Sequence, residues 1–160
     1  MNWAKASAIS DIIVAISVII SLIYVAGQLE QNTQALKQTA AISTTQVWTT
    51  QQTLLAQDAD LNRIFWQGMN ADAPLTESDQ MRFEAFLSGW IQAFQQSYLL
   101  HESGMLDSGL WHNQLQSMRW VFSNKGAQNH WDKWKSAHIP DFVEFVDTFI
   151  HENTVVPGGK

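Results

Sequence analysis

The chain of 160 residues contains no cysteine. Disulfides, thiolate nucleophiles and cysteine-ligated zinc or iron–sulfur sites are therefore excluded. Charged residues are also few, at 15% of the chain, where an average soluble domain has roughly 25%. The net charge of −6 argues against a nucleic-acid partner, because binding phosphates requires basic surface.

Apolar residues are abundant and make up 46% of the chain. This fraction excludes disorder for most of the chain, since so much apolar surface needs burial. The longest apolar run, AISDIIVAISVIISLIYVAG, covers residues 8–27 and has no charge after Asp11. As a helix it would extend about 30 Å, the thickness of the hydrocarbon core of a bilayer. Trp3 and Tyr24 lie near its two ends, where amphipathic rings favour the membrane interface.

Three interpretations of this run compete. A transmembrane helix is favoured by the length of the run. A cleaved signal peptide would have its cleavage site at the small residues Val25, Ala26 and Gly27. The run is, however, longer than the hydrophobic region of a usual signal peptide. A buried core helix of this length would need a larger domain than the remaining residues provide. We therefore predict a single membrane span and a lipid bilayer as its surroundings.

Polar residues follow helical spacing through this span and just beyond it, and so predict a polar face on the helix. They are Ser10, Ser17, Ser21, Tyr24, Gln28 and Gln31. Ser17 and Ser21 also form a small-xxx-small pair, which allows two helices to approach closely. The face is interpreted as a self-association surface. The alternatives are the lining of a pore formed by several copies, or no function at all, since serine is tolerated in membrane helices.

Several short motifs resemble those of a widespread group of uncharacterised bacterial single-span membrane proteins. The span ends LIYVAGQL over residues 22–29 and is followed by NTQALK over 32–37, similar to the LIYLA-Q and NT-x-x-L-R/K runs of that group. Residues 104–107, GMLD, with Trp111, resemble its G-L-L-D-x-x-x-W segment. Trp131, Trp134 and residues 140–142 resemble its closing Trp-rich and P-x-F segments.

The resemblance covers most of the chain and implies an architecture, without implying an activity or a cofactor. It implies a single-pass protein of the bacterial inner membrane with its C-terminal domain in the cytoplasm. Members usually have arginine just after the span, whereas this chain has Glu30 and Gln31 there. One lysine on each side of the span, Lys5 and Lys37, leaves the orientation nearly undetermined by the positive-inside rule.

Beyond the span, residues 28–68 are rich in Gln and Thr and contain no proline. Ala40, Val47, Leu54 and Leu61 recur every seven residues, which is typical of a coiled-coil seam or of packing against a small bundle. We predict that the membrane helix continues into an amphipathic helix over 28–68. An ordinary amphipathic helix of the same domain explains the pattern equally well.

A helical bundle of about four further helices is predicted over residues 76–152. The side chains of Thr76 and Asp107 can cap helix N-termini. Helices are predicted to end at Gly104 and Gly126, and Pro140 is predicted to lie in the first turn of the last helix. Residues 68–75 are predicted as a loop, residues 1–7 as an N-terminal flank and residues 153–160 as a flexible tail. The predicted fold class is all-α.

No catalytic motif is recognised, and no catalytic, cofactor-binding or metal-binding residue is predicted. Six tryptophans could form an aromatic pocket, but core packing explains them better: Trp66, Trp90, Trp111, Trp120, Trp131 and Trp134. Trp131 and Trp134, with Lys133 and Lys135 beside them, could instead contact lipid headgroups. The five histidines lack the spacing of metal or di-iron sites.

Three functions remain open. The favoured one is a non-enzymatic, membrane-anchored scaffold or accessory subunit that forms homo-oligomers and contacts other membrane proteins. The second is a membrane-tethered ligand-binding or sensor domain with an aromatic pocket. The third is an enzyme whose histidines and carboxylates are brought together only by the fold.

Overall fold

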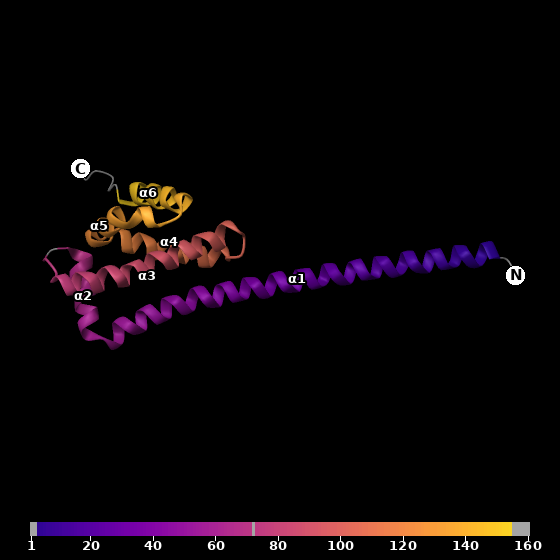
Figure 1. Ribbon diagram of the computed structural model, residues 1–160, viewed down its shortest axis with the longest axis horizontal. Helices are drawn as coiled ribbons and strands as arrows, with labels where there is room; N and C mark the ends of the chain where they lie inside the picture. The colour runs from indigo at the N-terminus through magenta and orange to yellow at the C-terminus, as the bar shows by residue number, and fades with distance from the viewer. Residues whose placement is uncertain (1–2, 72, 155–160) are drawn as a thin grey trace. The chain divides into compact units, whose positions relative to one another are not determined.

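The computed structural model is all-α, as predicted. It describes residues 3–71 and 73–154, and these residues contain no strand. The helices in chain order are α1 Trp3–Gln57, α2 Ala59–Asn70, α3 Glu77–Glu102, α4 Ser108–Phe122, α5 Lys125–Trp134, the 3-10 turn η1 Lys135–Ala137, and α6 Pro140–Thr154 (Figure 1). The chain divides into two compact units, one up to Thr39 and the other from Ala40 onward.

The first unit is a helical segment and belongs entirely to α1. From Ile12 to Val25 its large apolar side chains are exposed, by 49% at Val25 and 68% at Ile23. Among the described residues, α1 is the one helix long and apolar enough to cross a membrane. The segment is helical from Trp3, so most of the expected N-terminal flank is already part of the helix.

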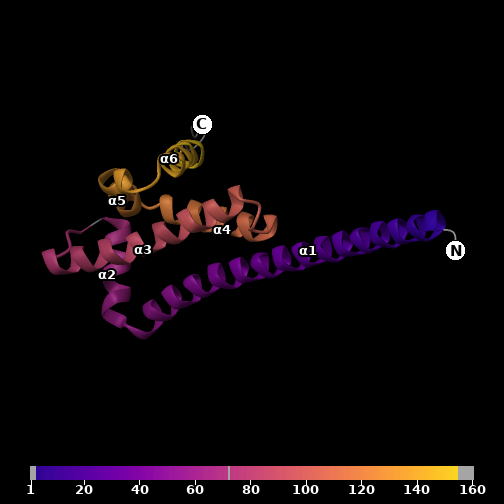
Figure 2. The ribbon, with the colours of Figure 1, turned by 45° about the vertical axis from the view of Figure 1, so that its right-hand side comes forward.

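The second unit has a hydrophobic core to which all of α2 to α6 contribute. α2 packs on α3 and α5, while α4 packs on α3, α5 and α6 (Figures 1 and 2). The largest fully buried side chains are Trp131, Phe65, Phe94, Phe122, Phe142, Ile64, Met69, Leu87, Ile91, Met118, Val121 and Val146. Ile64, Phe65 and Met69 come from α2, so the bundle starts before residue 76, where the sequence pattern placed its beginning.

The helix predicted over 28–68 is interrupted at Asp58. This residue has extended backbone angles, φ −113° and ψ 98°, and its carboxylate accepts hydrogen bonds from the backbone N–H groups of Asp60 and Leu61. Asp58 is thus the N-cap of α2. α2 then continues to Asn70, two residues beyond the glycine at which the loop was expected to begin.

Other predicted boundaries are confirmed. The hydroxyl oxygen of Thr76 accepts from the N–H of Asp79, and the carboxylate of Asp107 accepts from the N–H groups of Gly109 and Leu110. Gly104 has a φ of +68° just after α3, in the left-handed region that glycine adopts without strain. α6 begins at Pro140 as predicted, and it extends to Thr154; residues 155–160 of the expected tail lie outside the described residues.

Gly126 is not the helix stop that the sequence suggested. α4 has already ended at Phe122, and Gly126 lies in the first turn of α5. A Cβ built on it would lie only 1.8 Å from the backbone oxygen of Gly68 in α2. A Cβ on Gly68 would in turn lie 2.4 Å from the ring of Phe83. Both glycines are therefore required by close packing between α2, α3 and α5, and not by the need to end a helix.

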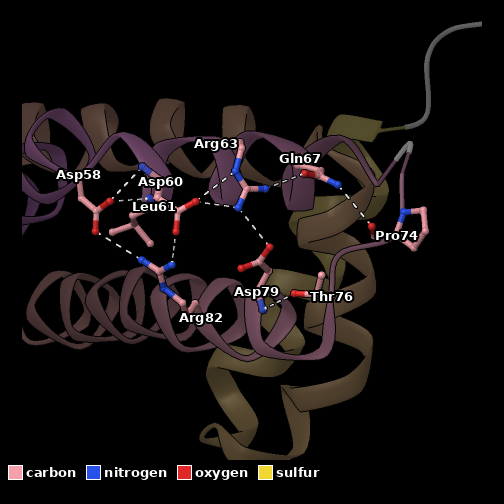
Figure 3. A network of polar contacts seen from close by, with 9 residues as sticks. All are labelled: Asp58, Asp60, Leu61, Arg63, Gln67, Pro74, Thr76, Asp79 and Arg82. Atoms are coloured by element: carbon pink, nitrogen blue, oxygen red, sulfur yellow. Dashed lines mark hydrogen bonds and ion pairs between the residues drawn. The ribbon is translucent and has the colours of Figure 1, made fainter.

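A polar network joins the start of α2 to the start of α3 (Figure 3). Arg82 of α3 pairs with the carboxylates of Asp58 and Asp60, while Arg63 of α2 pairs with Asp60 and with Asp79 of α3. Hydrogen bonds from the two arginines lower the pKa of Asp60. Because most of these groups are exposed, salt screens their attraction, and the network contributes little to the stability of the domain.

Candidate functional site

The predicted self-association face lies on α1. The helix is continuous through its members, so their spacing places them along one side. Ser17, Ser21, Tyr24, Gln28 and Gln31 are exposed. Trp3 and Ser10 belong to the same helix, but their side chains lie outside the described residues.

A shallow groove runs along this face in the apolar segment. The hydroxyl of Ser17 donates to the carbonyl of Ile13 at 2.8 Å, and that of Ser21 donates to the carbonyl of Ser17 at 2.9 Å. Both serine donors are thus satisfied inside their own helix, which makes them acceptable in lipid. The groove is lined by Ile13, Val14, Ser17, Val18, Ser21, Leu22 and Val25. Two of these side chains are small serines, and the other five are branched apolar ones.

The second unit contains a cavity of about 650 Å³ between α2, α3 and α5. Among its lining residues are Gln67, Gln80, Glu84, Asn129, His130 and Lys133, and Phe83 is the one aromatic residue. The cavity is therefore lined by polar and apolar side chains together, and it is not the aromatic pocket that the tryptophans suggested.

Glu84 is the carboxylate of this cavity, and its oxygens are already occupied. Lys133 Nζ lies 2.8 Å from Oε1, Gln80 donates to the same oxygen, and the indole N–H of Trp134 donates to Oε2 at 3.2 Å. Burial by itself would raise the pKa of Glu84, but these hydrogen bonds outweigh it and hold the pKa below its usual value. Glu84 is thus a stable anion and is unsuited to act as a general acid near neutral pH.

His130 is the most buried histidine of the described residues, at 5% exposure. Its Nε2 lies 3.2 Å from the hydroxyl oxygen of Ser88, and its Nδ1 is buried without a hydrogen-bond partner. Burial lowers the pKa of His130, and nearby Lys133 and His138 act in the same direction against the opposing charge of Glu84. Burial also lowers the pKa of His138.

The serine–histidine contact was not found from the sequence, because the two residues are 42 positions apart and no local motif connects them. It lacks the parts that a hydrolase requires. The carboxylate nearest to His130 is occupied by Lys133, and Ser88 lies in the middle of α3, where the helix uses its own backbone N–H groups. The contact is explained by core packing.

The tryptophans divide between the core and its edge. Trp90 and Trp131 are buried, whereas Trp66, Trp120 and Trp134 are exposed by 42–45%. The indole N–H of Trp131 donates to Asp147 at 2.7 Å, and Lys135 pairs with the same carboxylate. Trp131 is thus fully used in packing, and Lys133 and Lys135 are already paired, which disfavours contact of this region with lipid headgroups.

The histidines do not gather into a metal site. Within residues 3–71 and 73–154, no group of three or more histidine or acidic side chains is arranged to hold a metal ion. His101 stacks on Trp111, with ring centroids 4.5 Å apart, and His138 contacts Gln95 through Nδ1. Both histidines have structural partners.

Comparison with protein-family models, with curated proteins and with solved structures finds no match for this chain. The resemblance to bacterial single-span proteins thus stays a prediction from short motifs.

The buried His130 and the half-buried His138 predict a pH dependence of stability. Their pKa values are lowered in the folded chain, so the unfolded chain binds protons first as the pH falls below about 6.5. Stability is therefore expected to fall as the pH drops from 7 toward 5. A double variant, His130→Gln with His138→Gln, should show a smaller fall in Tm over this range.

The measurement is thermal unfolding of the full chain in mild detergent, followed by circular dichroism at several pH values. His151→Gln is the matched control, because His151 is exposed. If the Tm of the double variant and the Tm of the wild type fall by the same amount between pH 7 and pH 5, the pH dependence has another origin.

Proposed function

We propose that the chain is a single-pass protein of the bacterial inner membrane, anchored by residues 8–27, that forms homo-oligomers and serves as a non-enzymatic scaffold or accessory subunit. Its helical domain lies in the cytoplasm, where it is available to other membrane proteins. This is the function that the residues of α1 support best.

One observation carries the anchoring part of the proposal. Every large apolar side chain from Ile12 to Val25 is exposed by about half or more, and no charged residue interrupts the run. Each such side chain gains roughly 1.5–3 kcal/mol when it leaves water. A row of this length is stable only in an apolar solvent such as the bilayer, or under an extensive protein cover.

The self-association part is supported by the groove at Ser17 and Ser21. In lipid, helices associate through close van der Waals packing, which small residues on one face allow. The serine pair provides this face, and the branched side chains around it supply matching ridges. A second copy of the same helix fits such a groove in parallel orientation, because both copies insert with the same direction.

The test begins with cell membranes that contain the full-length chain. Under alkaline extraction, the protein should remain with the lipid fraction. Native mass spectrometry in nanodiscs should then give a defined multimer. Extraction into the soluble fraction would contradict the anchoring, and a bare monomer would contradict the self-association.

A double variant, Ser17→Leu with Ser21→Leu, should remain anchored but associate about tenfold more weakly, a loss of about 1.4 kcal/mol. The larger side chains fill the groove while preserving an apolar span. Ile12→Leu with Ile19→Leu is the control, because these positions face away from the serines on the helix. Equal dissociation constants for the two double variants would contradict a contact at the serine face.

A ligand-binding domain on the same anchor is the second candidate. It is favoured by the cavity between α2, α3 and α5, because its volume of about 650 Å³ lies within the range of small-molecule sites. The glutamine, asparagine and histidine side chains in the lining favour a ligand that carries hydrogen-bonding groups. The same native mass spectrum tests this, since a retained ligand would appear as additional mass on each chain.

A further inference from the structure

A second surface on α1 remains uncovered within the second unit. In this unit the helix has one face packed against the core, formed by Ala40, Thr44, Trp48 and Leu55. The indole N–H of Trp48 donates to Gln114 at 2.8 Å, and its ring contacts Trp90. This face is fully used by the domain's own packing.

We propose that a neighbouring face of the same segment binds a second copy of the chain in a short parallel coiled coil; this rests on the proposed function, which places both copies in one membrane. The face consists of Ser43, Val47, Thr50 and Leu54, and we call it the α1 seam. Its residues line a shallow groove together with Gln46 and Gln51. Leu54 is exposed by 46%.

The spacing of the seam matches the contact positions of a coiled coil. Its members are separated by four, three and four residues, the alternation that keeps side chains at one interface between two helices. Small residues alternate with apolar ones: serine and threonine occupy one set of positions, valine and leucine the other. Two identical helices in register can therefore pack Val47 against Val47 and Leu54 against Leu54.

The charge distribution identifies the partner as another copy of this chain. The protein is acidic, yet residues 38–57 contain no charged side chain at all. In a parallel symmetric contact, each residue lies close to its own equivalent, so any charge there would be repelled by an identical one. A twenty-residue helical segment without charge avoids this cost.

The membrane makes a short contact sufficient. Four seam residues are too few for a stable dimer between free molecules. Anchoring both chains in the same bilayer, with the same orientation, raises their effective concentration and fixes their relative direction. The seam then adds specificity to an association that begins in the span.

The chain's lack of cysteine makes a cross-linking test simple, because any introduced thiol is unique. Full-length single-cysteine variants are reconstituted in nanodiscs or vesicles and oxidised with copper phenanthroline. Thr50→Cys and Leu54→Cys should form disulfide-linked dimers at least tenfold faster than the matched controls Thr49→Cys and Ile42→Cys. Thr49 matches Thr50 in residue type, and Ile42 is a branched apolar residue like Leu54. Both controls are exposed and lie on another side of the helix.

Ser17→Cys is tested in parallel and reports on the span alone. If Ser17→Cys cross-links while Thr50→Cys is no faster than Thr49→Cys, the seam is wrong and the proposed function stands. If neither Ser17→Cys nor Thr50→Cys cross-links, self-association itself is wrong. Similar rates at every position would indicate random collision and would also overturn the seam.

Discussion

Gly126→Ala is expected to destabilise the helical domain by about 3 kcal/mol or more. The added methyl group would lie 1.8 Å from the carbonyl oxygen of Gly68, an impossible distance; the methyl is bonded directly to the backbone of α5, and the oxygen belongs to the backbone of α2. No side-chain rotation can relieve this contact. α2 and α5 must move apart, and the packing of Ile64 and Phe65 on the core is then disturbed.

The measurement is chemical unfolding of the full chain in mild detergent, followed by circular dichroism. Gly89→Ala is the matched control, since its new Cβ would lie 3.0 Å from the flexible end of Gln51. Alanine is also the better helix former, so this variant should stay within about 1 kcal/mol of the wild type. Wild-type stability of Gly126→Ala would show that α2 and α5 do not cross at this distance.

Trp131→Ala is expected to cost 3–5 kcal/mol, the usual loss for an aromatic residue in a core. Trp131 is 1% exposed, contacts the rings of Phe122 and Phe142, and donates its indole N–H to Asp147. Its removal leaves a large cavity and takes from Asp147 one of its donors, so that Lys135 alone still bonds to this carboxylate. The helical signal should therefore be lost at a clearly lower denaturant concentration.

Two further variants separate the causes. Trp131→Phe retains much of the packing but loses the hydrogen bond, so its cost should be about 1–2 kcal/mol. Trp134→Ala removes a residue that is 44% exposed and should have a smaller effect than Trp131→Ala. Equal losses for Trp131→Ala and Trp134→Ala would contradict the assignment of Trp131 to the core.

Helix ends that depend on a few neighbouring residues could be predicted from the sequence. Thr76, Asp107 and Gly104 act as expected, because a cap needs only its own backbone surroundings. Asp58 is the exception. Between Gln57 and Ala59 it resembles any polar residue on a helix surface, and its capping role depends on the turn that brings α2 against the core.

Features that join distant residues could not be predicted. The glycines at positions 68 and 126 meet only because α2 crosses α5, and the contact between Ser88 and His130 depends on α3 lying beside α5. A single sequence contains no signal for such pairs. The tryptophans illustrate the same limit, since helical spacing indicates that they face inward but not which of them reach the centre.

The candidate site on α1 is closer to what the sequence indicates, because it depends on one helix. Spacing alone predicts that Ser17 and Ser21 share a face with Gln28. The packed face through Ala40 and Trp48 required the structure, since it depends on partners in α3 and α4. The heptad of Ala40, Val47 and Leu54 thus divides between two surfaces, with the alanine buried and the leucine exposed.

Threonine side chains give α1 an unusual hydrogen-bonding surface. Six of them donate their hydroxyl to the carbonyl four residues earlier: Thr33, Thr39, Thr44, Thr45, Thr49 and Thr53. This bonding satisfies the hydroxyl protons within the helix. What the exposed threonines offer outward is then a methyl group and an oxygen lone pair. These oxygens accept hydrogen bonds, so a partner that presents donors would match this side of the helix.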